Sequence, residues 1–273
     1  MFEEPYRWVE AVGNRRTYLD EQFKQGSPVV AMSYDAGILL ATVSKGTPKL
    51  YEIYDRIALG GMGHPADLEK LRFSLLEMAH TEGFNRSPSD VTGSRLVKYG
   101  VAPVVKQAFE EVYKAPFILK ILLAELGLKP SKDVLLTVNY DGTFEEHTGC
   151  AVLAATTAVQ KDMVAYLRQE SASRLSLAQA LALALRAWAL GDRNQRLANE
   201  DQERGDEKKA TVVKVEAGDA ASLSAHLKDK AAERTIECAV LDRGQTGSSK
   251  YRALTLDELG RWLPDELKAA LPR

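Results

Sequence analysis

Hydrophobic and polar positions change their spacing several times along the chain, which predicts an ordered mixture of helices and strands. From about residue 6 to residue 23, apolar residues recur at helical spacing among charged ones: Val9, Val12, Leu19 and Phe23. We therefore expect an amphipathic helix that ends near Gly26. The next stretch, GSPVVAMSYDAGILLATV (residues 26–43), has two apolar runs around an Asp-Ala-Gly turn, which predicts a β-hairpin.

Helices and strands follow one another in blocks over the rest of the chain. Strands are expected at RIALGGMG, FILKILLAEL, DVLLTVNY, CAVLAA, TIECAVLD and KYRAL. Helices are expected at residues 64–80, 91–113, 159–169 and 176–191, and from Thr255 onward. The charged stretch NEDQERGDEKK (residues 199–209) is expected to form a solvated loop, followed by one more strand and a short helix before TIECAVLD.

The order of these blocks is strands, two helices, strands, two helices, strands. It excludes alternating βαβ units and predicts an α+β fold, a four-layer α/β/β/α sandwich preceded by the N-terminal helix. The glycines of GGMG are not followed by the lysine and hydroxyl residue of a phosphate-binding loop, so small residues at a strand–helix junction are expected there.

Composition excludes several classes of function. The chain has 273 residues and a net charge of −2, so its overall charge does not favour binding to nucleic acid or to an anionic membrane. It has no long apolar span, and its start, MFEEPYRW, lacks the basic and then apolar pattern of a signal peptide, so we expect a cytoplasmic protein. Cys150 and Cys238 lie inside separate apolar runs, as buried thiols do in a reducing compartment. The four histidines show no metal-ligand spacing, and neither a metal nor a cofactor is expected.

The Gly-Ser pair before the first strand raises a chemical question. In self-processing hydrolases, a nucleophile at this position is freed when the chain is cut just before it, and its own amine then serves as the base. Ser27 is therefore either a masked nucleophile or only the first residue of a strand.

Several segments in the same order resemble the proteasome subunits, in particular the α subunit of the bacterial, actinobacterial type. They are SPVVAMSYDAGILLAT, KLYEIYDR, DVTGSRL, VNYDG and ECAVLD, together with a Gly-x-x-x-Asp motif (Gly63 to Asp67) that opens the first long helix. The resemblance implies an Ntn-hydrolase, proteasome-type sandwich over residues 26–273. The chain departs from the family in two places: its first helix lacks the Tyr-Asp-Arg motif of archaeal and eukaryotic α subunits, and residues 203–233 look like an insertion.

The resemblance also gives a reading of Ser27. Active proteasomal subunits support their nucleophile with an aspartate on the second strand and a lysine after it. Here Pro28 follows Ser27, and Val43 stands at the aspartate position, where it can neither orient nor charge-balance a site. Lys49 remains at the lysine position, but a lysine alone does not make the catalytic group. We expect an inert Ser27 and no catalytic residue; the alternative is an active Ntn peptidase or amidohydrolase that processes itself before Ser27.

Lys49 then needs another role. In the α subunits that the chain resembles, the lysine of the Lys-[Ile/Leu] motif lines a pocket between neighbouring subunits, where the C-terminal tail of a ring-shaped AAA ATPase docks. A lysine suits a carboxylate because its compact ammonium has three donors. The resemblance places Gly26 and Ala66 at small positions that leave room for the tail. The alternative is that Lys49 is an ordinary solvated lysine at a strand edge with no binding role.

The remaining expectations concern assembly. The resemblance implies a homo-oligomeric, heptameric ring that caps proteasome β subunits, with unfolded proteins, in some systems tagged by a ubiquitin-like modifier, fed in by the ATPase. Residues 1–25 would form a gate segment and the amphipathic helix, with Phe2, Glu3, Glu4 and Pro5 at the axial pore. A degenerate homologue that forms rings without a peptidase partner is a third reading.

Overall fold

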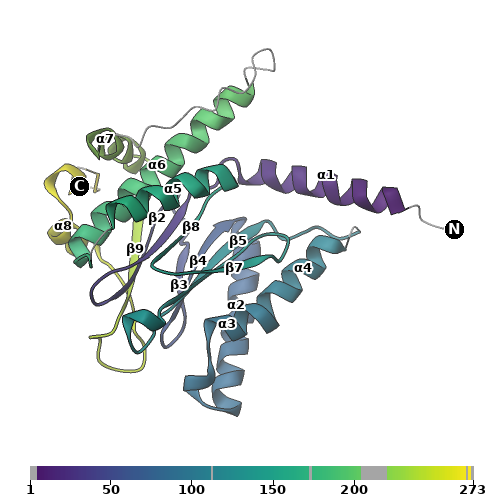
Figure 1. Cartoon of the computed structure of the whole chain (residues 1–273), viewed down its shortest axis with the longest axis horizontal. Helices are drawn as coiled ribbons and strands as arrows, with labels where there is room; N and C mark the ends of the chain where they lie inside the picture. The colour runs from purple at the N-terminus through teal and green to yellow at the C-terminus, as the bar shows by residue number, and fades with distance from the viewer. Residues whose placement is uncertain (1–4, 112, 172–173, 204–219, 269, 272–273) are drawn as a thin grey trace.

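The computed structural model, which describes residues 5–111, 113–171, 174–203, 220–268 and 270–271, contains two antiparallel five-stranded sheets packed face to face (Figure 1). Helices cover the outer face of each sheet. This arrangement is the predicted four-layer α/β/β/α sandwich, with the predicted helix in front of it.

The first sheet has the strand order β10-β9-β2-β1-β8, and the second has the order β3-β4-β5-β6-β7. The strands of the first sheet are β1 (Val29–Ser33), β2 (Gly37–Ser44), β8 (Cys150–Leu153), β9 (Thr235–Asp242) and β10 (Tyr251–Ala253). The strands of the second sheet are β3 (Leu50–Tyr54), β4 (Ile57–Gly63), β5 (Leu119–Glu125), β6 (Val134–Val138) and β7 (Phe144–His147).

The helices divide between the two outer faces. The first sheet is covered by α5 (Thr157–Glu170), α6 (Leu177–Glu203), α7 (Ala220–Ala231), α8 (Leu256–Trp262) and α9 (Asp265–Lys268). The second sheet is covered by α2 (Pro65–Asn85), α3 (Gly93–Leu96), η2 (Val97–Val101) and α4 (Ala102–Glu110). Two short turns, η1 (Pro88–Asp90) and η3 (Pro130–Lys132), lie in the connections.

Alternation along the hairpin explains how one strand serves two cores. On β1, Val29 and Ala31 face the layer between the sheets, whereas Val30 and Met32 face the helices. Every residue of β2 is buried, because β2 lies between β1 and β9 and has a packed layer on each face. Both thiols are free and buried as expected, and burial raises the pKa of each.

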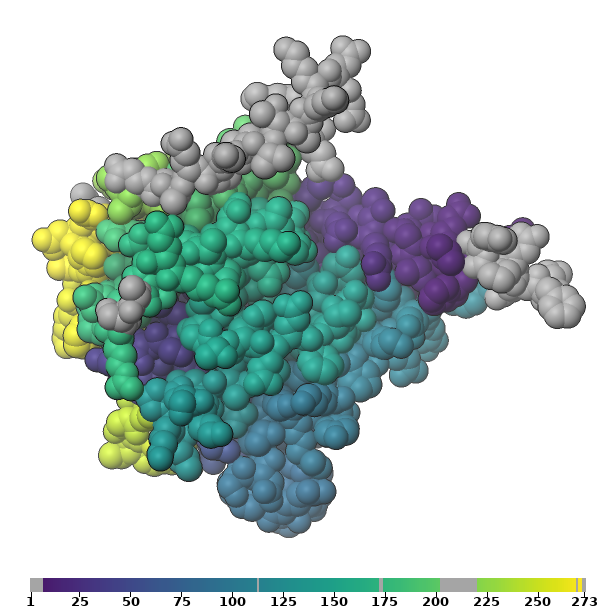
Figure 2. Space-filling view, viewed as in Figure 1, coloured from purple at the N-terminus to yellow at the C-terminus, as the bar shows by residue number. Residues whose placement is uncertain are grey.

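The first helix, α1 (Pro5–Phe23), is only partly built into the body. Leu19 and Phe23 are fully buried at the end of the core between the sheets, but Val9, expected on the same apolar face, is 63% exposed. Val9 is exposed because the outer part of α1 stands clear of the sandwich (Figures 1 and 2). Arg15 fastens its middle to the end of α4 by donating hydrogen bonds to the carbonyls of Ala108 and Phe109, each 2.9 Å long.

Two helices run past their predicted ends. The helix expected over residues 64–80 continues as α2 to Asn85. The helix expected to end at Gly191 continues as α6 to Glu203, so residues 199–203 of the charged stretch are helical. Gly191 is tolerated because α5 packs closely there, and a Cβ on Gly191 would lie 2.4 Å from the sulfur of Met163. The polar residues beyond it are held by pairs one turn apart, such as Arg196 with Asp192 at 3.0 Å.

The helix expected over residues 91–113 is present as the continuous run α3, η2 and α4. Its wider turn, η2, comes just before Pro103, which has no N–H to donate and crowds the preceding turn. Of the expected insertion, residues 204–219 lie outside the described residues, together with the strand expected just after the charged stretch; the expected short helix is α7.

Candidate functional site

Ser27 lies between the end of α1 and the start of β1, and its hydroxyl is held on both sides. Its Oγ donates a hydrogen bond of 2.6 Å to the carbonyl of Val43 and accepts one of 3.0 Å from the indole nitrogen of Trp188 on α6. The residue is 6% exposed. Neither partner is a base, so nothing in this arrangement activates the oxygen as a nucleophile.

The side chain at the family's aspartate position is fully buried and apolar. Val43 belongs to the core between the first sheet and its helices, and it pairs with Ile236 in the β2–β9 ladder. A carboxylate would have to leave water to occupy that site, at a cost that an unpaired buried charge does not recover.

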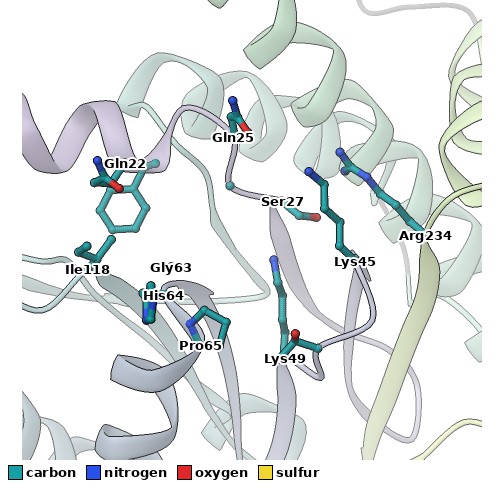
Figure 3. Close-up of a pocket in the computed structure, with 13 residues that line it drawn as sticks. Gln22, Gln25, Ser27, Lys45, Lys49, Gly63, His64, Pro65, Ile118 and Arg234 are labelled. Atoms are coloured by element: carbon teal, nitrogen blue, oxygen red, sulfur yellow. The ribbon is translucent and has the colours of Figure 1, made fainter.

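A cleft of about 310 Å³ opens beside Ser27 (Figure 3). Six segments form it: the end of α1, the link from α1 to β1, the loop from β2 to β3, the junction of β4 with α2, the residue before β5 and the residue before β9. Its lining residues are Gln22, Phe23, Gln25, Gly26, Ser27, Lys45, Thr47, Lys49, Gly63, His64, Pro65, Ile118 and Arg234.

Lys49 is fixed to the wall of the cleft through its backbone. Its N–H donates a 2.9 Å hydrogen bond to the carboxylate of Glu237 on β9, and its carbonyl accepts one of 2.9 Å from Gly61 on β4. These bonds leave the ammonium free to point into the cleft, where it has no hydrogen-bond or ion-pair partner among the described residues. Burial lowers the pKa of the Lys49 ammonium to about 8; Glu237 partly opposes the shift, and Arg234 and Lys45 add to it.

The junction of β4 with α2 shapes the opposite wall. Gly63 has φ of +138°, and a Cβ there would lie 2.0 Å from the carbonyl of Ile118, so only glycine fits this bend. His64 caps α2 through its Nδ1, which accepts the N–H of Ala66 at 3.3 Å, and Asp67 accepts the N–H of Ile118 at 2.9 Å. The Gly-x-x-x-Asp motif therefore sets the backbone of this wall.

The structure brings two of the three expected pocket residues together. Gly26 and Lys49 line the cleft, whereas Ala66 is exposed on the first turn of α2 and is not among the lining residues. A Cβ on Gly26 would lie 2.3 Å from the terminal carbon of Met62, so its small size first makes room for a neighbour within the chain. Lys45, His64 and Arg234 line the cleft without having been expected there.

The expected gate residues fall largely outside the described part of the chain. Phe2, Glu3 and Glu4 are not described, and Pro5 is described only as the first residue of α1. Within the described ranges, no helix has the length and apolarity that a membrane span requires, and no three His, Cys, Asp or Glu side chains are grouped as metal ligands.

Comparison with known proteins agrees with this geometry. The family model for the proteasome subunit matches residues 23–203. The proteasome subunit alpha of Actinosynnema mirum is 31% identical over 183 residues, which are 65% of this chain and 66% of that protein. The corresponding subunits of Thermobifida fusca and Streptosporangium roseum are 28% and 31% identical, over 64% and 66% of this chain and 70% of each relative.

The matched region of the family model contains the cleft's β1, β2, β3 and β4 walls, Ser27 and Lys49. It also covers more than half of the 273 residues. The chain therefore belongs to the proteasome subunit family.

Proposed function

We propose that the chain is a non-catalytic α-type subunit of a bacterial proteasome, which forms the outer ring, controls access of substrates and docks an ATPase. The observation that carries the proposal is the occupied hydroxyl of Ser27 beside a cleft whose basic side chains have no acidic counterpart in its described lining. The names of the relatives support the α type.

The proposed partners are further copies of this chain in a heptameric ring, proteasome β subunits, an AAA ATPase ring and unfolded protein substrates. The free outer part of α1 supports a ring contact, because Trp8 and Val9 are 53% and 63% exposed there. Large apolar side chains on a helix that stands out from its own domain favour burial against another chain.

Lys49 is the proposed receptor for the terminal carboxylate of the ATPase tail. Its ammonium is partly buried and has no partner among the described residues, so a carboxylate entering the cleft would meet an uncompensated charge. Charged hydrogen bonds of this kind are stronger in a cleft than in open water.

The alternative of a self-processed hydrolase is disfavoured by the packing of α1. A cut before Ser27 would remove Leu19 and Phe23, which are fully buried, and Phe23 stacks on Tyr140 at 5.8 Å between ring centroids. Intact mass of the purified chain tests this directly. We expect the N-terminal segment to be retained, apart from Met1; a mature chain that begins at Ser27 would establish the alternative.

Ser27→Ala gives a second test, in which stability should fall while peptidase activity stays the same. The substitution leaves the indole N–H of Trp188 buried without its acceptor, so the free energy of unfolding should fall by about 1–3 kcal/mol. The peptidase rate of the assembled α/β particle should stay unchanged. Urea denaturation and a peptide assay measure the two effects, with Ser74→Ala on the exposed face of α2 as control, expected within about 0.5 kcal/mol. Loss of peptidase activity at equal assembly would refute the inert role.

Docking should also depend on pH through Lys49. The ammonium loses its proton as the pH rises through its pKa of about 8, so the affinity for a carboxylate should fall between about pH 7 and pH 10. The bound carboxylate favours the charged form, which places the midpoint for the complex above that of the free protein. Fluorescence anisotropy of a labelled tail peptide measures the profile. Lys49→Arg, which keeps its charge, should bind with a flat profile; a flat profile for the wild type would contradict the role of Lys49.

A further inference from the structure

The basic side chains of the cleft come from strand ends that the two sheets bring to one edge. Lys45 follows the last residue of β2 and Arg234 precedes the first residue of β9; because Ser44 pairs with Thr235, the two basic residues continue the same ladder. Lys49 precedes β3 in the other sheet. Figure 3 shows all three side chains around one space.

Arg234 is held in place by a buried carboxylate behind the cleft. Its Nη1 lies 3.2 Å from Oδ1 of Asp192, and the two side chains are 10% and 7% exposed. Asp192 is shared, because its Oδ2 also lies 3.0 Å from Nε of Arg196 and 2.9 Å from Nε2 of His226. Burial alone would raise the pKa of Asp192, but these partners outweigh it, and the carboxyl stays ionised.

The charges around the cleft do not balance. Three cations line it, Lys45, Lys49 and Arg234, and among them only Arg234 has an ion-pair partner, Asp192, in the described structure. None of the described residues that line the cleft is acidic. Lys45 and Lys49 are therefore left for a ligand.

We propose that the cleft recognises a C-terminal peptide tail that carries two negative charges close together, its terminal carboxylate at Lys49 and an acidic side chain at Lys45 and Arg234. Asp192 acts as a positioning residue, because it fixes the guanidinium that faces the second anion. The inference rests on the proposed docking function and adds the chemical class of the tail.

The test compares three fluorescein-labelled octapeptides that differ only at the C-terminus. One ends in glutamate, one in glutamine, and one in glutamine with its carboxyl converted to an amide. Binding to the full-length protein, in whatever ring it forms, is measured by fluorescence anisotropy. The glutamate peptide should bind about fivefold or more tightly than the glutamine peptide, since it adds one charged contact at a partly desolvated site.

Two variants locate the second anion. Lys45→Gln removes an exposed charge that makes no ion pair in the described structure, so it should fold normally and reduce the glutamate preference to about twofold or less. Arg234→Gln should reduce the glutamate preference to the same extent. If this variant unfolds because Asp192 loses an ion-pair partner, the result with Lys45→Gln alone tests the second anion. Lys98→Gln, on η2 beyond the second sheet, is the matched control and should keep the full preference.

The outcomes separate the two proposals. If the amidated peptide binds as well as the free acid, the docking function fails. If the free acid is required but glutamate and glutamine bind equally, docking stands and the second anion is refuted. A glutamate preference that survives Lys45→Gln unchanged also refutes it, because Lys45 then takes no part in binding the second anion.

Discussion

A particle assembled with Lys49→Ala is expected to hydrolyse short peptides like the wild type but to lose stimulation by its ATPase. The ammonium has no partner within the described chain, so the fold loses no ion pair or hydrogen bond from it. Docking loses one charged hydrogen bond, worth about 1.5–3 kcal/mol, or roughly a 10- to 150-fold weaker affinity. ATPase-driven degradation of an unfolded protein measures the effect.

Lys49→Met separates charge from packing, because it keeps an apolar stem of similar length and removes only the ammonium. Both variants should assemble normally by gel filtration, and both should fail to respond to the ATPase. Degradation at the wild-type rate by either variant would show that Lys49 is not the docking residue.

Deleting residues 2–5 should speed hydrolysis of short peptides several-fold in the absence of ATPase. The proposed gate lies at and before Pro5, the first residue of α1, and the outer part of α1 stands clear of the body. Phe2 and its ring mates would form a weak apolar plug, since each phenylalanine gains less than the roughly 1.5–3 kcal/mol of full burial. Glu3 and Glu4 would keep the mouth of the pore wetted.

The comparison uses steady-state rates of truncated and full-length α chains with the same β subunit, at equal assembly. Phe2→Ala alone is the matched control for the plug and should give part of the increase. The preference of the β active sites among peptides should not change. Equal rates for all three chains would show that residues 2–5 do not close the pore. The segment within residues 203–233 would then be the next candidate.

The layers of this fold were predictable because each long element has a clear period. The alternation through Val29, Val30, Ala31 and Met32 divides β1 between two cores, and the helical spacing of Leu19 and Phe23 fixes the inner end of α1. The short strand β7 was not predicted, because FEEH is an edge segment with three exposed residues and no apolar alternation. The end of α6 was predicted too early, at Gly191, because the sequence does not show that Met163 of another helix packs against this glycine.

The site was predictable only in part, because contacts between distant parts of the chain bring several of its residues together. A motif places Lys49, but Lys45 and Arg234 meet through the register of β2 with β9, which joins residues far apart in the chain. Arg234 is further fixed by Asp192 on α6. No local pattern in the sequence carries such pairings, and the bend at Gly63 places His64 and Pro65, rather than Ala66, at the cleft.

The most direct test of the α-type role is electron microscopy of the particle reconstituted with a candidate β subunit. The account predicts a stacked barrel in which this chain forms both outer rings, keeps α1 ahead of Ser27 and leaves the inner rings to β subunits. A particle with this chain in the inner rings, with its first ordered residue at Ser27, would contradict it.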